Sequence, residues 1–394
     1  MHNRFRGLPA FSQRERRLLW LFVGGLLLMA LLFAFLEWAR AGFVTGGNDA
    51  APQIAVLVPK GGVFHNIEET TREAVTLALS YPPLGGDVTL SVRFYFIDTT
   101  PDSVAWAARR AAHRPGTVAI IGPLTTRQGI AAQSVAPDVP VISTLATSTP
   151  SNGDADFWHV LASDTMQIQA IGAFLWQQGL QKTFWVVDSS AYARKMLTFV
   201  EQSSGGDVNV WHLEETPLNG SAAADFIHRL EDTQTQAVVY LGAPEGLASL
   251  VNTLAAHEKT WAVVTTDAAL TDELQTLPSQ VPLYYATSFV LLSGIKQSPQ
   301  EVKAWRSTMG ALASAPYALE TLQATWAVMA AVGGGPPTRN TVRANLSSVR
   351  VLDPLNGERF FHEQWLLPAR VAIYQADHQQ PRWNDNPLVY LWER

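Results

Sequence analysis

Apolar positions along this chain form one long run near the N-terminus and a series of short runs after it. Residues 18–36 read LLWLFVGGLLLMALLFAFL, which is 19 residues without a charged side chain. A helix of that length spans about 28 Å, close to the thickness of the hydrocarbon core of a bilayer. The pattern therefore predicts a transmembrane helix.

The flanks of this run predict its orientation. Residues 1–17 contain five arginines and one glutamate, and an excess of basic residues places that side of the membrane in the cytoplasm. The chain after residue 40 is therefore expected in the periplasm or the extracellular space. The sequence ARA at 39–41 fits a signal-peptidase site, but the apolar run exceeds the usual signal core. An uncleaved anchor, followed by a linker at 37–51, is favoured over a cleaved signal.

From residue 53 onward, short β-rich runs alternate with segments of helical period. The first group has predicted strands at 53–58, 91–97, 117–121 and 140–143, and helices near 67–80 and 103–113. After Asp164 the alternation restarts, with predicted strands at 183–187, 208–213, 237–241 and 261–266, each followed by a helical stretch. This rhythm is typical of mainly parallel sheets with helices on both faces. The sequence thus predicts two successive α/β units, each a doubly wound sheet.

The C-terminal third predicts additions to both units. Helices are expected near 299–309, 317–332 and 338–346, and a turn at Gly357 leads to a strand around 371–374.

Composition narrows the classes of partner. Of the 394 residues, 47% are hydrophobic and 16% are charged, and the formal net charge is -6. Nucleic acid is not an expected partner, because phosphate binding needs clustered lysine and arginine. The absence of cysteine excludes disulfides, thiolate metal sites and a cysteine nucleophile. The nine histidines never fall four residues apart, so no metal site or other cofactor is expected.

Catalytic signatures are also missing from the sequence. The chain has no GxSxG elbow, no GxxxxGK[ST] phosphate loop, no SxxK motif and no GxGxxG after a strand. Adjacent carboxylates occur at Glu68-Glu69 and Glu214-Glu215, and such pairs are usually a solvated face. We therefore expect that the protein is not an enzyme.

Four local stretches carry a resemblance to a known family. In chain order they are FIDTTPDSVAWAARRA, IGPLTTRQGIAA, VPVISTLATSTP, and LNGERFF followed by ARVAIYQ. Their order resembles the leucine/isoleucine/valine-binding proteins, which are type I periplasmic binding proteins of ABC transporters, over about residues 53–375. The resemblance implies two lobes that close on a small polar ligand. The ligand is expected between the lobes at the carboxyl ends of the strands, where open α/β sheets typically bind ligands.

The same resemblance implies how the chain divides between the lobes. Lobe one is expected to comprise residues 52–163 and 288–345. Lobe two is expected to comprise residues 164–287 and 346–376, and residues 377–394 are expected to form a C-terminal tail.

In lobe one, the resemblance places Thr126 at the family's serine position for a ligand carboxylate. Thr126 follows a predicted strand and begins a helix, where free backbone amides favour an anion. A threonine here is equally typical of an N-cap that satisfies its own helix. Thr147 would add a second hydroxyl and Leu145 a backbone contact, although a Ser/Thr-rich turn is also an ordinary connection.

In lobe two, the resemblance implies that Tyr192 covers the ligand and that Asp267 pairs with an α-ammonium group. Packing on the sheet is the alternative for Tyr192, and capping of the next helix is the alternative for Asp267. The chain departs from the family pattern at Ala243, where relatives carry Tyr before Pro-Glu, and at Arg127, where a small residue is common. Both departures favour a ligand that is bulkier or more acidic than leucine.

Together these features predict a membrane-anchored, extracytoplasmic solute-binding protein. Its expected partners are an amino acid or amide, the membrane through its N-terminal helix, and an ABC permease or another envelope protein. The alternative is a module of the same fold that has lost its ligand and serves as a docking or regulatory subunit of an envelope complex.

Overall fold

The computed structural model describes residues 51–60, 65–82, 90–148, 156–204, 208–213, 218–295, 300–333, 336–355, 357–380 and 382–394. Residues 50–394 form one compact unit. The predicted transmembrane segment at 18–36, with its flanks at 1–17 and 37–50, lies outside the described residues. Within the described ranges, no helix combines the length and the apolar character needed to cross a bilayer.

Among the described residues, the first sheet has eight strands in the order β11-β12-β13-β5-β4-β3-β1-β2. Their bounds are β1 (Gln53–Pro59), β2 (Ser91–Ile97), β3 (Thr117–Gly122), β4 (Val141–Ser143), β5 (Phe157–His159), β11 (Arg350–Asp353), β12 (Gly357–His362) and β13 (Trp365–Leu367). Strands β1 to β5 pair in parallel, as their continuous apolar runs predict. Strands β11, β12 and β13 form an antiparallel meander that joins the sheet through β5.

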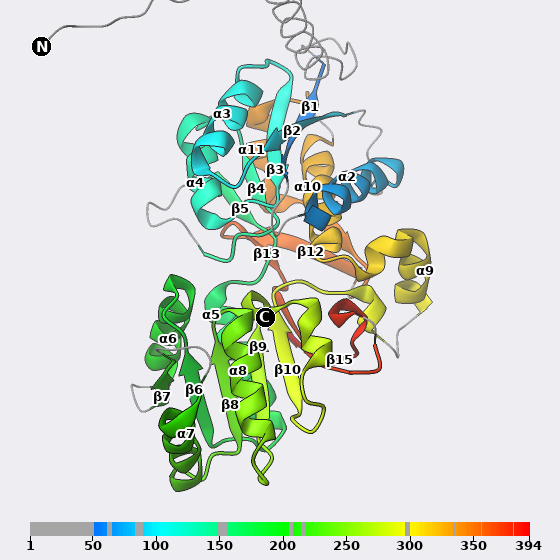
Figure 1. The fold of residues 1–394 in the computed structure, drawn as a ribbon. Helices are drawn as coiled ribbons and strands as arrows, with labels where there is room; N and C mark the ends of the chain where they lie inside the picture. The colour runs from blue at the N-terminus through cyan, green and yellow to red at the C-terminus, as the bar shows by residue number, and fades with distance from the viewer. Residues whose placement is uncertain are drawn as a thin grey trace, which may run out of the picture. The chain divides into compact units, whose positions relative to one another are not determined.

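Five helices cover the two faces of this sheet (Figure 1). They are α2 (His65–Ser80), α3 (Pro101–Ala112), α4 (Thr126–Val135), α10 (Ala318–Val332) and α11 (Arg339–Asn345). Helices α3 and α4 pack on one face, and α2, α10 and α11 pack on the other.

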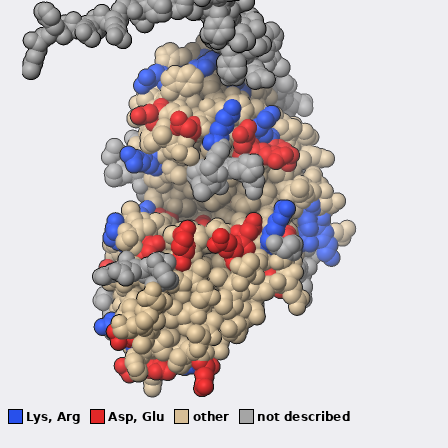
Figure 2. Space-filling model, in the orientation of Figure 1, with Lys and Arg blue, Asp and Glu red and all other residues tan. Residues whose placement is uncertain are grey.

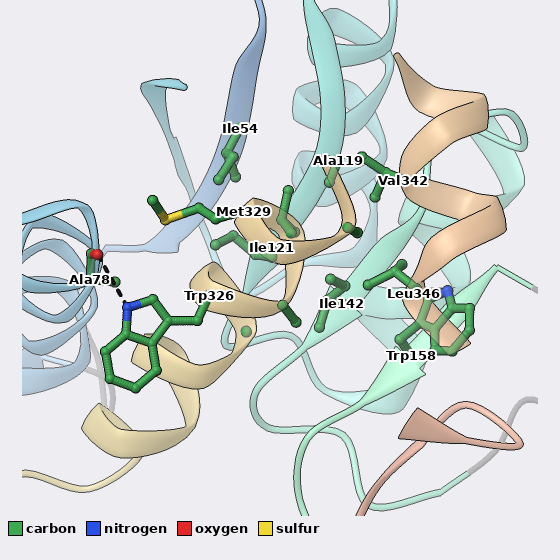
Figure 3. Close-up of a cluster of buried hydrophobic side chains, with 14 of the residues drawn as sticks. Ile54, Ala78, Ala119, Ile121, Ile142, Trp158, Trp326, Met329, Val342 and Leu346 are labelled. Atoms are coloured by element: carbon green, nitrogen blue, oxygen red, sulfur yellow. Dashed lines mark hydrogen bonds between the residues drawn. The ribbon is translucent and has the colours of Figure 1, made fainter. Parts of the chain in front are cut away.

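The face covered by α10 holds the largest apolar cluster of this sheet. Trp326 of α10 is 1% exposed and belongs to a cluster that includes side chains from β1, β3 and β4, and its ring points toward Ala78 of α2 (Figure 3). Its indole N–H donates to the carbonyl of Ala78 at 3.2 Å and to that of Tyr81 at 2.7 Å. These hydrogen bonds satisfy the one polar atom of the indole ring, which is otherwise surrounded by hydrocarbon. Helix α10 is therefore fixed to the end of α2.

The second sheet has seven described strands in the order β15-β14-β10-β9-β8-β6-β7. Their bounds are β6 (Thr183–Val187), β7 (Asn209–His212), β8 (Ala237–Leu241), β9 (Ala262–Thr266), β10 (Leu283–Thr287), β14 (Arg370–Gln375) and β15 (Leu388–Glu393). Helices α5 (Asp164–Gln177) and α6 (Ala191–Ser204) cover one face, and α7 (Gly220–Asp232) and α8 (Pro244–Ala255) cover the other. Helix α9 (Gln300–Met309) lies between β10 and α10 in the chain.

The chain passes between the two sheets three times, after β5, after β10 and after β13. Each sheet therefore draws on separate segments of the chain. Both sheets are mixed, because antiparallel strands extend one edge of an otherwise parallel core.

The structure differs from the sequence-based expectations in three places, two in how the chain divides between the lobes and one in a predicted helix. The meander at 350–367 belongs to the first sheet, although 346–376 was expected in lobe two. The expected tail contains β15, which pairs with β14. After β9 the expected helix is replaced by two short 3-10 turns, η2 (Asp267–Ala269) and η3 (Asp272–Thr276).

A buried ion pair connects the two sheets close to the third passage. Arg370 at the start of β14 donates to Asp353 at the end of β11, with distances of 2.7 Å from Nη1 to Oδ1 and 2.5 Å from Nη2 to Oδ2. Arg359 of β12 lies beside this pair and donates to the carbonyls of Val160 and Pro368, the first residues of the first and third of these connections. These side chains fix the chain where it changes sheets.

Candidate functional site

The candidate site begins where β3 of the first sheet leads into α4. Thr125 is the N-cap of α4: its hydroxyl accepts from the backbone amide of Gln128, and the side-chain Oε1 of Gln128 accepts from the backbone amide of Thr125 at 2.9 Å. The cap is therefore Thr125, and the alternative in which Thr126 caps its own helix is wrong. Thr126 is the first helical residue, and its hydroxyl has no hydrogen-bond partner among the described residues. It is available to a ligand.

Ser143, the last residue of β4, ties the next loop to this turn. Its hydroxyl donates to the carbonyl of Leu124 at 2.6 Å and accepts from the amides of Leu145 at 3.1 Å and Ala146 at 2.8 Å. The Leu145 amide is thus engaged, so a ligand can use only the carbonyl of that residue. Thr147 follows with a partly exposed side chain.

His159 supports this loop from below. Its ring stacks on Trp365 with centroids 4.0 Å apart, and Nδ1 lies 3.2 Å from the carbonyl of Ala146. Burial lowers the pKa of His159 to about 4, so the imidazole is neutral at pH 7 and its Nδ1–H donates to that carbonyl. The loop backbone is therefore hydrogen-bonded to an uncharged ring that is stacked on Trp365.

In the second sheet, one hydrogen-bonded chain joins the two predicted residues. The Tyr192 hydroxyl donates to Oε1 of Gln167 at 3.3 Å, and Nε2 of Gln167 donates to Oδ1 of Asp267 at 3.2 Å. Asp267 directly follows β9, and its carboxylate also accepts from the backbone amide of Ser288. The N-cap of η2 is Thr266, and the Asp267 carboxylate also accepts from its own backbone amide at the start of this turn.

The environment of Asp267 disfavours a charge without a partner. Burial raises the pKa of Asp267, the hydrogen bond from Gln167 lowers it and the nearby Asp164 raises it, and the resulting pKa is about 6. Burial and the nearby Asp267 also raise the pKa of the Tyr192 and Tyr317 hydroxyls. A cationic group of a ligand would offset this unfavourable burial.

Tyr317 was missed by the sequence reasoning. It precedes α10 with φ of 61° and ψ of 6°, a left-handed conformation that is uncommon for a bulky residue. Its ring packs edge-on against Phe289 with centroids 4.6 Å apart. Such strained conformations concentrate at functional sites, but no local sequence signal indicates one here.

Lys195 links the second-sheet cluster to the first-sheet loop. Its ammonium lies 2.7 Å from Oδ2 of Asp164 and also contacts the Ser148 hydroxyl, which donates to the same carboxylate oxygen at 2.8 Å. The Asp164 amide donates to the carbonyl of Thr147 at 3.0 Å. The loop that carries Leu145 and Thr147 is thereby held against the starts of α5 and α6.

Five residues were predicted for the site, and the structure connects them in two groups. Thr126 begins α4 and Leu145 and Thr147 lie in the loop after β4, and Ser143 joins this loop to the turn before α4. Tyr192 and Asp267 are joined by Gln167. Within the described residues, no hydrogen bond joins the side chains of one group to those of the other, so a ligand that bridges them stays a prediction.

Acidic side chains are unevenly distributed on the face of the molecule drawn in Figure 2. Figure 2 shows a hollow across the middle of one face, with acidic side chains gathered along its lower edge. Exposed carboxylates after second-sheet strands include Glu245, Asp272 and Glu273. Within the described ranges, no three His, Cys, Asp or Glu side chains are placed to hold a metal ion. The arrangement suits electrostatic capture of a cationic group.

Comparisons with known proteins bear on this arrangement. The model of a family described as periplasmic binding protein matches residues 52–381. A search of curated proteins found no match.

Solved structures with the same fold include a leucine-binding protein of Thermotoga maritima (16% identity, TM-score 0.64, covering 86% of this chain and 98% of that chain). A branched-chain amino acid substrate-binding protein of Streptococcus pneumoniae in complex with isoleucine is similar (16% identity, TM-score 0.66, covering 87% of this chain and 99% of that chain). A solute-binding protein of R. palustris in complex with benzoate is also similar (15% identity, TM-score 0.63, covering 86% of this chain and 96% of that chain).

Proposed function

Because the chain belongs to the periplasmic binding protein family, we propose that it is a membrane-anchored, extracytoplasmic solute receptor that captures an amino acid or a similar small polar ligand. Type I members of this family are solute-binding proteins of ABC transporters. Delivery to an ABC-type permease is the corresponding role for this chain, and the protein acts without catalysing a reaction.

The observation that carries this proposal is the setting of Asp267. Its carboxylate lies at the carboxyl end of a strand, has a raised pKa and is hydrogen-bonded to Gln167, and the described residues offer it no ion pair. A ligand ammonium group would supply the missing charge, while Thr126 and Thr147 on the first-sheet loops would hold a carboxylate. One of the similar solved structures is in complex with isoleucine and another with benzoate, so the ligand class is open to both kinds of acid.

Ligand capture is expected to raise the melting temperature of the purified chain. A ligand at 100 times its dissociation constant adds about 2.7 kcal/mol to the free energy of unfolding. A thermal-shift screen against the amino acids, their amides and benzoate measures this. If no compound shifts the melting temperature, the chain is better explained as a docking or regulatory subunit of an envelope complex, for which Ala243, in place of the family tyrosine, is the supporting observation.

Membrane anchoring makes a separate prediction about topology. With residues 18–36 as an uncleaved anchor and the arginine excess before it, residues from about 45 onward are expected outside the cytoplasm. Alkaline phosphatase fused after residue 60 should be active, and a fluorescent protein that folds only in the cytoplasm should be dark there. The reverse result would invert the topology, and a shortened mature chain would replace the anchor by a cleaved signal.

A further inference from the structure

Gln167 connects three elements of the second sheet's unit. It lies in α5 and is 1% exposed. Its side-chain amide donates to Oδ1 of Asp267 at 3.2 Å and to the carbonyl of Ala286 in β10 at 3.0 Å, and its oxygen accepts from the Tyr192 hydroxyl of α6 at 3.3 Å. Both amide hydrogens and the carbonyl oxygen therefore have partners.

The Ala286 carbonyl fixes which way this amide points. A backbone carbonyl only accepts hydrogen bonds, so the NH2 group of Gln167 must face it. The same NH2 group then faces Asp267, and the oxygen faces Tyr192. As a result, Asp267 receives a hydrogen bond that favours its carboxylate form, and the Tyr192 hydroxyl donates its hydrogen to Gln167.

We infer that Gln167 is a positioning residue of the ligand site, which holds Asp267 as a hydrogen-bond acceptor and sets the direction of the Tyr192 hydroxyl. The role in ligand binding rests on the proposed function. Gln167 itself is buried behind these two side chains and acts through them. The other titratable groups that face Asp267 are Asp164 of α5 and Tyr317 before α10.

Two substitutions separate positioning from packing. Gln167→Met keeps the length of the side chain and removes its polar atoms, so Asp267 and Tyr192 both lose their partner. Gln167→Glu keeps the shape and the acceptor for Tyr192 but places a carboxylate oxygen against Asp267. The matched control is Gln177→Glu, which makes the same change at an exposed position of the same helix.

The first measurement needs no ligand. Carbon-13 NMR of the aspartate carboxyls in the full-length protein, with Asp267 assigned from Asp267→Asn, gives the pKa of Asp267 in each variant. We expect a higher pKa in Gln167→Met than in the wild type, a higher one still in Gln167→Glu, and no change in Gln177→Glu. An unchanged pKa in both Gln167 variants, with melting temperatures that show folded protein, would overturn the inference.

The second measurement uses L-isoleucine and benzoate as probes, one with an ammonium group and one without. Loss of a hydrogen bond to a charged group corresponds to a decrease in affinity of about 10- to 100-fold, which we expect for L-isoleucine in Gln167→Met, with benzoate affected far less. An equal loss for both probes would assign Gln167 to packing alone. If the wild type binds neither probe, the proposed function loses support, and the titration of Asp267 still decides the role of Gln167.

Discussion

Asp353→Asn is expected to lower the free energy of unfolding by about 3 to 5 kcal/mol, the usual cost of removing one partner of a buried ion pair. Asp353 is 2% exposed and Arg370 is 3% exposed, and the two side chains make a doubly hydrogen-bonded pair between β11 and β14. The substitution keeps the shape of the side chain but leaves the Arg370 guanidinium with less charge to balance it in a place that water does not reach.

A second guanidinium makes the loss larger. Arg359 is 3% exposed, and burial together with the neighbouring Arg370 lowers the pKa of Arg359 to about 10, an effect that Asp353 opposes. Without Asp353, the buried guanidinium groups of Arg359 and Arg370 repel each other with less negative charge beside them. Glu393, which accepts from Arg370 at 2.6 Å, is the carboxylate that remains in contact with Arg370. The effect should therefore fall toward the upper part of the expected range.

Urea denaturation at pH 7 measures this loss, and the chain offers a matched control. Glu358→Gln makes the same acid-to-amide change on the neighbouring strand, where Glu358 pairs with Arg350 at 2.8 Å with both side chains mostly exposed. Exposed pairs of this kind contribute at most about 1 kcal/mol. Similar losses in the two variants would mean that burial adds nothing at Asp353, contrary to this account.

The alternation of short apolar runs was sufficient to predict most of the elements. Strands β2, β6 and β8 have the predicted bounds, and β1, β3, β4, β7 and β9 agree to about one residue at each end, whereas β5 and β10 of the parallel cores were not predicted. The signal is strong there because buried parallel strands are apolar on both faces and are separated by helices of a different period. The family resemblance then predicted the two-lobed fold, which the family match confirms.

The edges of the sheets were harder to predict. Strands β11 and β12 alternate between buried and exposed positions, and such a pattern fits the edge of either sheet equally well. Strand β15 has the same half-buried character, and the sequence predicts only a tail there because nothing local indicates that β14 has an open edge. Register with a distant strand is a property of the folded chain rather than of the segment itself.

The site shows the same division between local and long-range information. The cap at Thr125 was available in the sequence, because Thr125 and Gln128 have the spacing of a capping box. The role of Gln167 was not, since it depends on partners 25, 100 and 119 positions away in the chain. Residues of that kind become visible only when three elements have been packed together.

The raised pKa of Asp267 gives the ligand site a defined pH window. The ordinary value for an aspartate is 3.8, and in the folded protein it is about 6. Folding therefore becomes less favourable as the pH rises from about 4 to about 6, because the unfolded chain releases this proton first. Asp267→Asn should accordingly unfold at no lower a temperature than the wild type at pH 7.

Ligand affinity should increase as Asp267 loses its proton, whereas the stability of the fold decreases. Asp267→Ala is expected to cost about 2 to 5 kcal/mol of affinity for an amino-acid ligand, the range for truncating one partner of a buried charge pair. Because only the carboxylate pairs with an ammonium group, wild-type affinity should fall by up to about tenfold per pH unit below pH 6. Calorimetry between pH 5 and 8, with Asp272→Ala as an exposed control, tests both statements. An Asp267→Ala variant that binds as tightly as the wild type, or an affinity that is flat across this range, would remove Asp267 from the site and the ammonium group from the ligand.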